Sequence, residues 1–169
     1  KLDKTIHDFM AFIDKPNASD IIIYHLSMLA QAAPKIVVDA LKAEMKKPNG
    51  MIISLFNHPQ QSDSRYMNIL FALDKLTFYS ESAVPACRIL FRLYQTDQNK
   101  FRDSNSPYSS LLNALCFINT YFPFPIKRKV ELLLNFLKKD SYNGGKLIVG
   151  ILNKDEISIS SPYGRIGQY

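Results

Sequence analysis

Helical periodicity punctuated by proline is the sequence feature that most constrains how this chain can fold. Apolar residues recur every three or four positions along most of its length, which is the period of one face of an α-helix. Pro34 and Pro107 stand where two such segments begin, and proline suits the first turn of a helix because no backbone N–H is needed there. The pattern predicts an all-α fold.

About eight periodic segments follow one another, separated by proline, glycine and asparagine. Two apolar stretches, 51–56 and 147–152, are too short for the period to decide between helix and strand. Residues 157–160 alternate isoleucine with serine, which is typical of a short strand or of an extended linker. The sequence therefore allows one short β element. Asn143-Gly144-Gly145 is predicted to break the helix before it. Helices are expected over residues 6–13, 20–32, 34–47, 64–76, 84–94, 107–121 and 126–139, with a last short turn over 163–169.

Length and composition favour a single domain. The chain has 169 residues, of which 47% are apolar, and a chain of this length buries roughly 70% of the surface that it exposes when unfolded. No stretch has the composition of a linker, so residues 1–169 are predicted to form one compact domain. The chain begins with Lys1 rather than Met, and we expect it to be a fragment of a longer protein. No apolar run reaches the roughly 20 residues that span a bilayer.

Positive charge is confined to the second half of the chain. Residues 1–85 carry nine Lys/Arg and nine Asp/Glu, whereas residues 86–169 carry twelve against six, which accounts for the whole net charge of +6. Such asymmetry points to an anionic partner: an acidic protein, an anionic lipid or a phosphate group. Only six of the 21 basic residues are Arg, the side chain that reads bases by paired hydrogen bonds, which argues against nucleic acid as the partner.

The helix predicted over 126–139 is amphipathic. At 100° per residue its apolar side chains gather on one side, which is the side expected to face the core. That side holds Ile126, Val130, Leu133, Leu134 and Leu137, widened by Leu132 and Phe136. The opposite arc holds Lys127, Arg128, Glu131, Asn135, Lys138 and Lys139.

The cations of this helix form the candidate binding site. Three of them lie in its first turn, where the positive end of the helix dipole disfavours cations unless an anion approaches. Two more lie in the last turn. The candidate contact residues are Lys127, Arg128, Lys129, Lys138 and Lys139. The alternative interpretation is a solvated basic face whose lysines extend into water.

Phe124, in the Pro123-Phe124-Pro125 corner before these cations, is a further candidate. If exposed, it would add an aromatic side chain to the basic site, a combination typical of membrane-surface or partner-docking sites. If buried, it would fill the core at a helix corner. Both interpretations stay open on the sequence.

Cys87 is the candidate for catalysis. It lies near the expected start of a helix and beside Arg88, a setting that can lower a thiol pKa and produce a nucleophile. Its base would be His58, in a polar loop, or His25. The alternative is a small buried thiol, because no cysteine-protease signature surrounds it. The three histidines and two cysteines of the chain are too scattered for a metal site, so no metal or cofactor is predicted.

Two blocks in the last third of the chain carry a resemblance: residues 115–123, LCFINTYFP, and residues 161–169, SPYGRIGQY. Together with the Lys-, Asn- and Ile-rich composition, these blocks resemble helical domains of the type IV-translocated effectors that intracellular bacterial pathogens inject into host cells. The resemblance implies a module of a larger translocated protein that binds host proteins or membranes. It transfers no catalytic residue.

These observations predict a non-enzymatic helical interaction module that binds a protein partner or, alternatively, an anionic membrane surface. A cysteine-dependent hydrolase or transferase, using Cys87 with a histidine, is the competing prediction. Two cysteines in 169 residues form no disulfide framework, so a reducing, cytoplasmic-type environment is expected, including that of a host cell after secretion.

Overall fold

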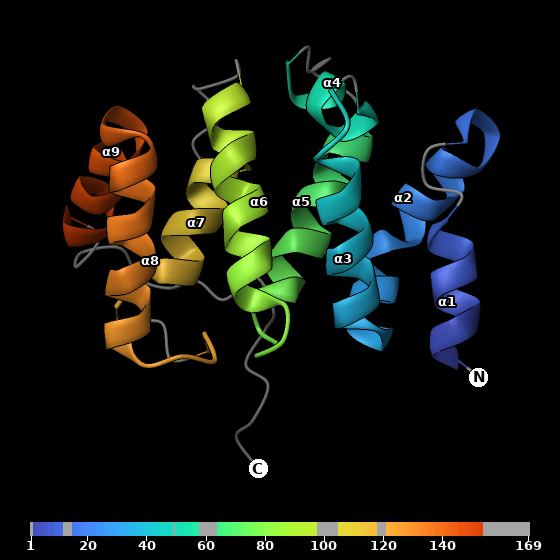
Figure 1. Ribbon diagram of the computed structural model, residues 1–169, viewed down its shortest axis with the longest axis horizontal. Helices are drawn as coiled ribbons and strands as arrows, with labels where there is room; N and C mark the ends of the chain where they lie inside the picture. The colour runs from blue at the N-terminus through green and yellow to red at the C-terminus, as the bar shows by residue number, and fades with distance from the viewer. Residues whose placement is uncertain are drawn as a thin grey trace.

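The computed structural model describes residues 2–11, 15–48, 50–57, 64–97, 105–117 and 121–153. Within these ranges the chain forms helices and no strand, which confirms the all-α prediction (Figure 1). The helices are α1 Leu2–Met10, α2 Pro16–Ala32, α3 Pro34–Glu44, α4 Met51–Asn57, α5 Ser64–Leu76, α6 Ala83–Thr96, α7 Pro107–Leu115, α8 Ile126–Lys139 and α9 Ser141–Leu152. Both short apolar stretches left open by the sequence are therefore helical, whereas residues 157–160 and 163–169 lie outside the described ranges.

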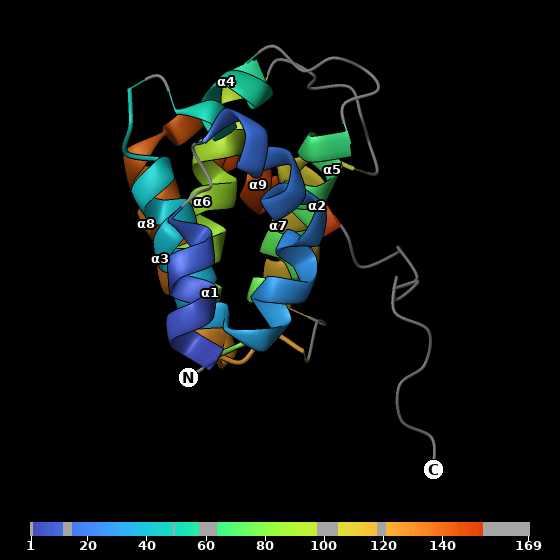
Figure 2. The same cartoon turned by 90° about the vertical axis from the view of Figure 1, so that its right-hand side faces the viewer.

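The helices stack in two layers along the long axis of the molecule. Seen end-on, α1, α3, α6 and α8 form one layer and α2, α5, α7 and α9 the other, with α4 across one end of both (Figure 2). Within each layer neighbours pack side by side, as α2 does on α5 and α7 on α9. The α1–α2 and α8–α9 pairs therefore lie at opposite ends of the stack (Figure 1). In such a stack each pair is held mainly by its nearest neighbours.

Local signals place several helix starts where the sequence predicts them. Pro34 is the first residue of α3. Ser106 caps α7: its Oγ accepts a hydrogen bond from the Ser109 N–H at 3.1 Å, and its own N–H donates to Ser109 Oγ at 3.2 Å. This reciprocal pair satisfies two backbone donors at the helix start. However, α7 ends at Leu115 rather than at the predicted Tyr121.

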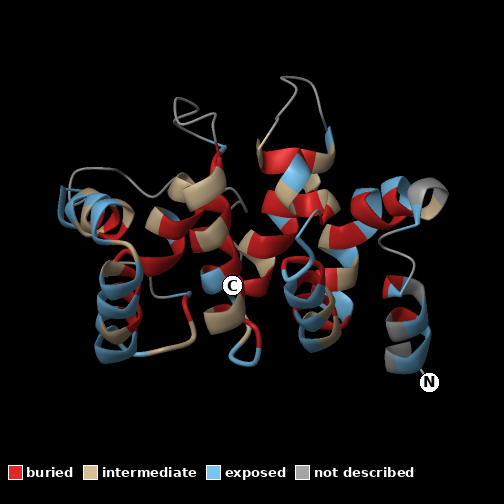
Figure 3. Cartoon of the chain, turned by 45° about the horizontal axis from the view of Figure 1, so that its top comes forward, coloured by how far each residue is buried: buried red, intermediate tan, exposed pale blue. Residues whose placement is uncertain are grey.

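Aromatic side chains contribute to the core, which runs through the centre of the stack (Figure 3). The Phe91 ring of α6 stacks on the Phe136 ring of α8, with centroids 4.2 Å apart and planes 3° from parallel. Tyr66 of α5 is buried, and its hydroxyl donates to Asp97 Oδ2 at 2.9 Å, so the polar tip of this core residue is satisfied.

The prediction that Asn143-Gly144-Gly145 breaks a helix is wrong: all three residues lie inside α9. The break falls at Asp140, whose carboxylate accepts from the Asn143 N–H at 3.0 Å and caps α9. Glycine is required at 144 because α9 crosses α8 there at close range. A Cβ on Gly144 would lie 2.6 Å from the Leu137 Cα, closer than packed atoms approach. The glycine serves helix packing, not helix termination.

Candidate functional site

α8 turns only part of its predicted apolar side toward the core. The residues it buries are Lys129, Leu132, Leu133 and Phe136. Three residues expected to face the core are instead exposed: Ile126 by 56%, Val130 by 38% and Leu134 by 47%. They recur every four positions and so lie on one face of the helix. We call them the α8 ridge.

Lys129 is buried, which corrects its place in the predicted contact set. Its side chain is only 2% exposed, and its Nζ donates to the Cys116 backbone oxygen at 2.7 Å. That carbonyl follows the last residue of α7, where helix carbonyls lack partners within the helix and attract cations. The ammonium also lies 5.4 Å from the centre of the Phe122 ring. Burial lowers the pKa of Lys129. This lysine therefore joins α8 to the end of α7 and is not available to a partner.

The other four predicted cations are exposed but lie on two sides of α8. Lys127 and Lys138 are about three turns apart and share one face, next to the α8 ridge. Arg128 and Lys139 share another face, on the far side of the exposed arc. Arg128 is also paired with Glu131 at 2.8 Å. The structure thus brings Lys127 and Lys138 to the apolar ridge and separates the other two cations from it.

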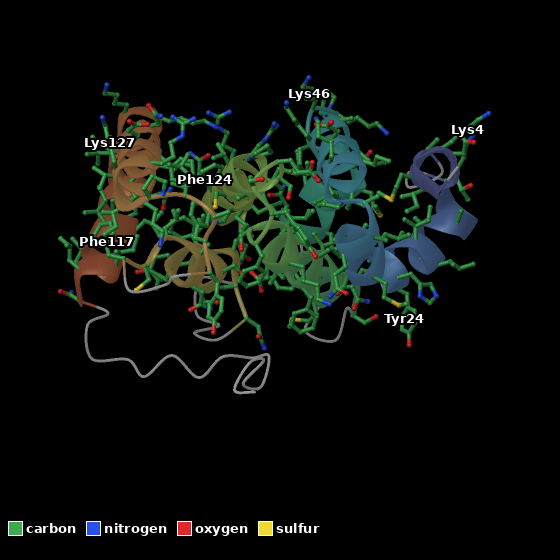
Figure 4. The ribbon with its side chains drawn as sticks, turned by 90° about the horizontal axis from the view of Figure 1, so that it is seen from below. Lys4, Tyr24, Lys46, Phe117, Phe124 and Lys127 are labelled. Atoms are coloured by element: carbon green, nitrogen blue, oxygen red, sulfur yellow. The ribbon has the colours of Figure 1, made fainter. Side chains whose placement is uncertain are left out.

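Phe124 does not extend into solvent as the exposed interpretation requires. It is half-buried and packs against the core, with its ring edge-on to that of Phe122 at a centroid distance of 5.6 Å. Figure 4 places it on the inner side of α8, whereas Lys127 lies at the outer end of the molecule. The structure therefore favours Phe124 as a packing residue at the helix corner.

α9 adds a second exposed ridge that sequence reasoning missed. Tyr142, Val149 and Leu152 are 63%, 57% and 58% exposed and lie on one side of this helix. Lys146 lies among them, with its Nζ 4.4 Å from the centre of the Tyr142 ring. The spacing of these residues places them on one side of a helix. Sequence reasoning missed this side because it assumed that Asn143-Gly144-Gly145 interrupts the helix. We call the ridges of α8 and α9, with Lys127, Lys138 and Lys146, the α8–α9 surface.

A third apolar ridge lies at the opposite end, on α2. Ile21, Tyr24 and Met28 are 58%, 71% and 67% exposed and share one face of the helix. Figure 4 shows Tyr24 directed away from the molecule. Over residues 16–32 the sole charged side chain is Asp20, whereas residues 126–153 hold six Lys/Arg and two Asp/Glu. The two ends thus expose similar apolar side chains in different electrostatic settings.

Cys87 lies in the core and not in an active-site setting. It is fully buried, and burial raises the pKa of its thiol, with a further rise from the nearby Asp74 carboxylate. A thiol with a raised pKa stays protonated at neutral pH and is a poor nucleophile. His25 is exposed on α2, and His58 lies outside the described residues. This environment favours the interpretation of Cys87 as a buried packing residue.

Among the described residues, no group of three or more His, Cys, Asp or Glu side chains is placed to hold a metal ion. The described helices include none with the length and apolar character needed to cross a bilayer. Comparison with protein-family models, with curated proteins and with solved structures found no match for this chain.

Proposed function

We propose that this domain is a non-enzymatic interaction module whose contact region is the α8–α9 surface. The observation that carries the proposal is the α8 ridge, whose three aliphatic side chains are exposed although the helix buries a lysine on its other side. Exposed apolar rows beside cations mark contact sites more often than isolated exposed apolar residues do. The buried environment of Cys87 supports the non-enzymatic function over the cysteine-dependent alternative.

The proposal includes the setting suggested by the resemblance, a module of a larger translocated effector acting in a host cell. Two facts are compatible with a reducing compartment of that kind. Both cysteines, Cys87 and Cys116, are free and buried, and structural disulfides are rare in cytosolic proteins.

Site-specific photo-crosslinking tests the contact region. Val130→benzoylphenylalanine places a photoreactive group in the α8 ridge, and Lys42→benzoylphenylalanine places the same group on an exposed position of α3 as the control. After irradiation in cells, we expect position 130 to form adducts with protein or lipid that position 42 does not form. Equal adduct yields at the two positions would contradict the proposed contact region.

A further inference from the structure

We infer that the partner of the α8–α9 surface is an anionic lipid bilayer, with the two apolar ridges entering the headgroup region and the lysines held at the phosphate level. This inference rests on the proposed function and names the ligand of the same surface. Three properties of the surface favour a bilayer: the kind of apolar side chain, the kind of cation and the place of the aromatic ring.

The apolar side chains are mostly aliphatic and arranged in rows. The α8 ridge is Ile, Val and Leu, and two of the three ridge residues of α9 are Val and Leu. An apolar row along the outside of a helix, bordered by lysines, is the pattern of a helix that lies in a membrane interface. Hot spots of protein interfaces are instead rich in Trp, Tyr and Arg, with Leu and Val under-represented.

The cations beside the ridges are lysines. Lys127, Lys138 and Lys146 are exposed, and the nearest arginine along the chain, Arg128, is paired with Glu131. Lysine is depleted in protein–protein interfaces because its strongly hydrated ammonium is costly to bury. At a membrane the same ammonium stays hydrated among lipid phosphates while its aliphatic stem covers apolar surface. The composition therefore matches a bilayer better than a folded protein partner.

Tyr142 gives the α8–α9 surface an exposed aromatic ring beside a cation. It is 63% exposed, and the Lys146 ammonium lies over its ring at 4.4 Å. Tyrosine is enriched at membrane–water interfaces, where the ring lies at the level of the headgroups. Tyr142 and Lys146 would then enter the headgroup layer as one unit.

Vesicle co-sedimentation tests the inference with the whole chain. The probes are phosphatidylcholine vesicles and vesicles in which about one-third of the lipid is phosphatidylserine. We expect binding to the anionic vesicles only, and loss of that binding at about 0.5 M salt, where charges more than a few ångströms apart are screened. Absence of binding to anionic vesicles at low salt would overturn the inference.

Two double variants, each with a matched control, test whether the α8–α9 surface makes the contact with the vesicle. Lys127→Ala/Lys138→Ala is expected to weaken vesicle binding about tenfold or more, whereas Lys42→Ala/Lys46→Ala removes the same charge near α3 and should change vesicle binding less than about twofold.

Ile126→Ser/Leu134→Ser should also weaken vesicle binding about tenfold, whereas Ile21→Ser/Met28→Ser removes similarly exposed apolar side chains from α2 and should not weaken it. All eight positions are exposed, so each variant should fold. Equal losses in a variant and its control would overturn the inference.

The crosslinking result separates failure of the inference from failure of the proposed function. Adducts from position 130 with protein alone, together with no vesicle binding, would overturn the bilayer as ligand and leave the contact region standing. Neither adducts nor vesicle binding would overturn both.

Discussion

α2 and α8 both expose an apolar ridge, but they do so in different electrostatic settings and for different structural reasons. α2 is apolar on nearly all sides; it buries Ile22, Ile23 and Leu26 against its neighbours and has apolar residues left over for its outer face. α8 has one apolar side, yet turns only part of that side inward and buries Lys129 with it. The comparison shows that an amphipathic pattern identifies a helix, whereas its neighbours decide how the helix is rotated.

At α8 two contacts explain the rotation. The Phe136 ring stacks on Phe91 of α6, and the Lys129 ammonium reaches the Cys116 carbonyl at the end of α7. When α8 is rotated so that both contacts form, Ile126 and Leu134 lie outside the core. The predictions below test how far the α8–α9 end behaves as a unit that differs from the α2 end.

The largest effect on the free energy of unfolding is expected for a substitution at the contact between α8 and α9. Gly144→Ala places a methyl group 2.6 Å from the Leu137 Cα and should lower the free energy of unfolding by about 2–3 kcal/mol. Gly145→Ala is the matched control, because its Cβ meets only the flexible end of Leu137 at 3.9 Å. It should be neutral or stabilising by up to about 1 kcal/mol, since alanine favours helices. Urea denaturation measures both.

Hydrogen exchange shows where the Gly144 effect acts. Faster exchange in α8 and α9, with unchanged exchange in α2 and α5, is the expected result for a stack held by nearest neighbours. Equally faster exchange in all four helices would mean that the α8–α9 end does not open independently of the α2 end.

The buried lysine comes next. Lys129→Ala removes the hydrogen bond to the Cys116 carbonyl and leaves space in the core, so it should cost about 2 kcal/mol of stability. Lys127→Ala, at an exposed neighbouring position, should change stability by less than about 0.5 kcal/mol. Thermal unfolding measures the difference, and equal small effects would contradict the buried position of Lys129.

A pH-dependent effect is expected between the two ends, at Asp74 of α5. Desolvation raises the pKa of Asp74 to about 6, above its ordinary value of 3.8 and despite a hydrogen bond from Ser110. The folded state then holds this proton more tightly than the unfolded state does. Stability should therefore fall as pH rises from about 4 to about 6, by on the order of 2 kcal/mol. Asp74→Asn should flatten this part of a stability–pH profile, and an unchanged profile would refute the assignment.

The smallest effect on stability, with the opposite pH dependence, is expected at the start of α9. Hydrogen bonds from Gln95 and Asn143 lower the pKa of Asp140 to about 2. Its stabilising contribution is present above about pH 4 and should be lost as pH falls toward 2. Asp140→Ala should cost about 1 kcal/mol at neutral pH, as for other N-cap residues. Hydrogen exchange should become faster at α9 and stay unchanged at α2. Faster exchange at both helices would mean that the two ends do not open independently.

Sequence reasoning worked where the determinants are local. Pro34 at the start of α3, Pro107 at the start of α7 and the bounds of α8 at Ile126 and Lys139 were all predicted and are confirmed. Each depends on backbone chemistry within a few residues, which the sequence displays directly.

It failed where the determinants lie on another helix. Gly144 is glycine because of Leu137 on α8, and Lys129 is buried because of a carbonyl that follows α7. No local pattern reveals such partners. The sequence therefore pointed to α8 as the helix that carries the proposed contact residues, whereas the side chains exposed on that helix had to be taken from the fold.

The most direct test of the difference between the two ends uses tryptophan, which this chain lacks. Val130→Trp and Tyr24→Trp each give a single fluorescent reporter, one in the α8 ridge and one in the α2 ridge. With anionic vesicles that contain brominated lipids, we expect the emission of Trp at position 130 to shift to shorter wavelength and to be quenched, because the ring enters the headgroup region. The reporter at position 24 should be unaffected. Equal responses, or a response at position 24 alone, would contradict the account.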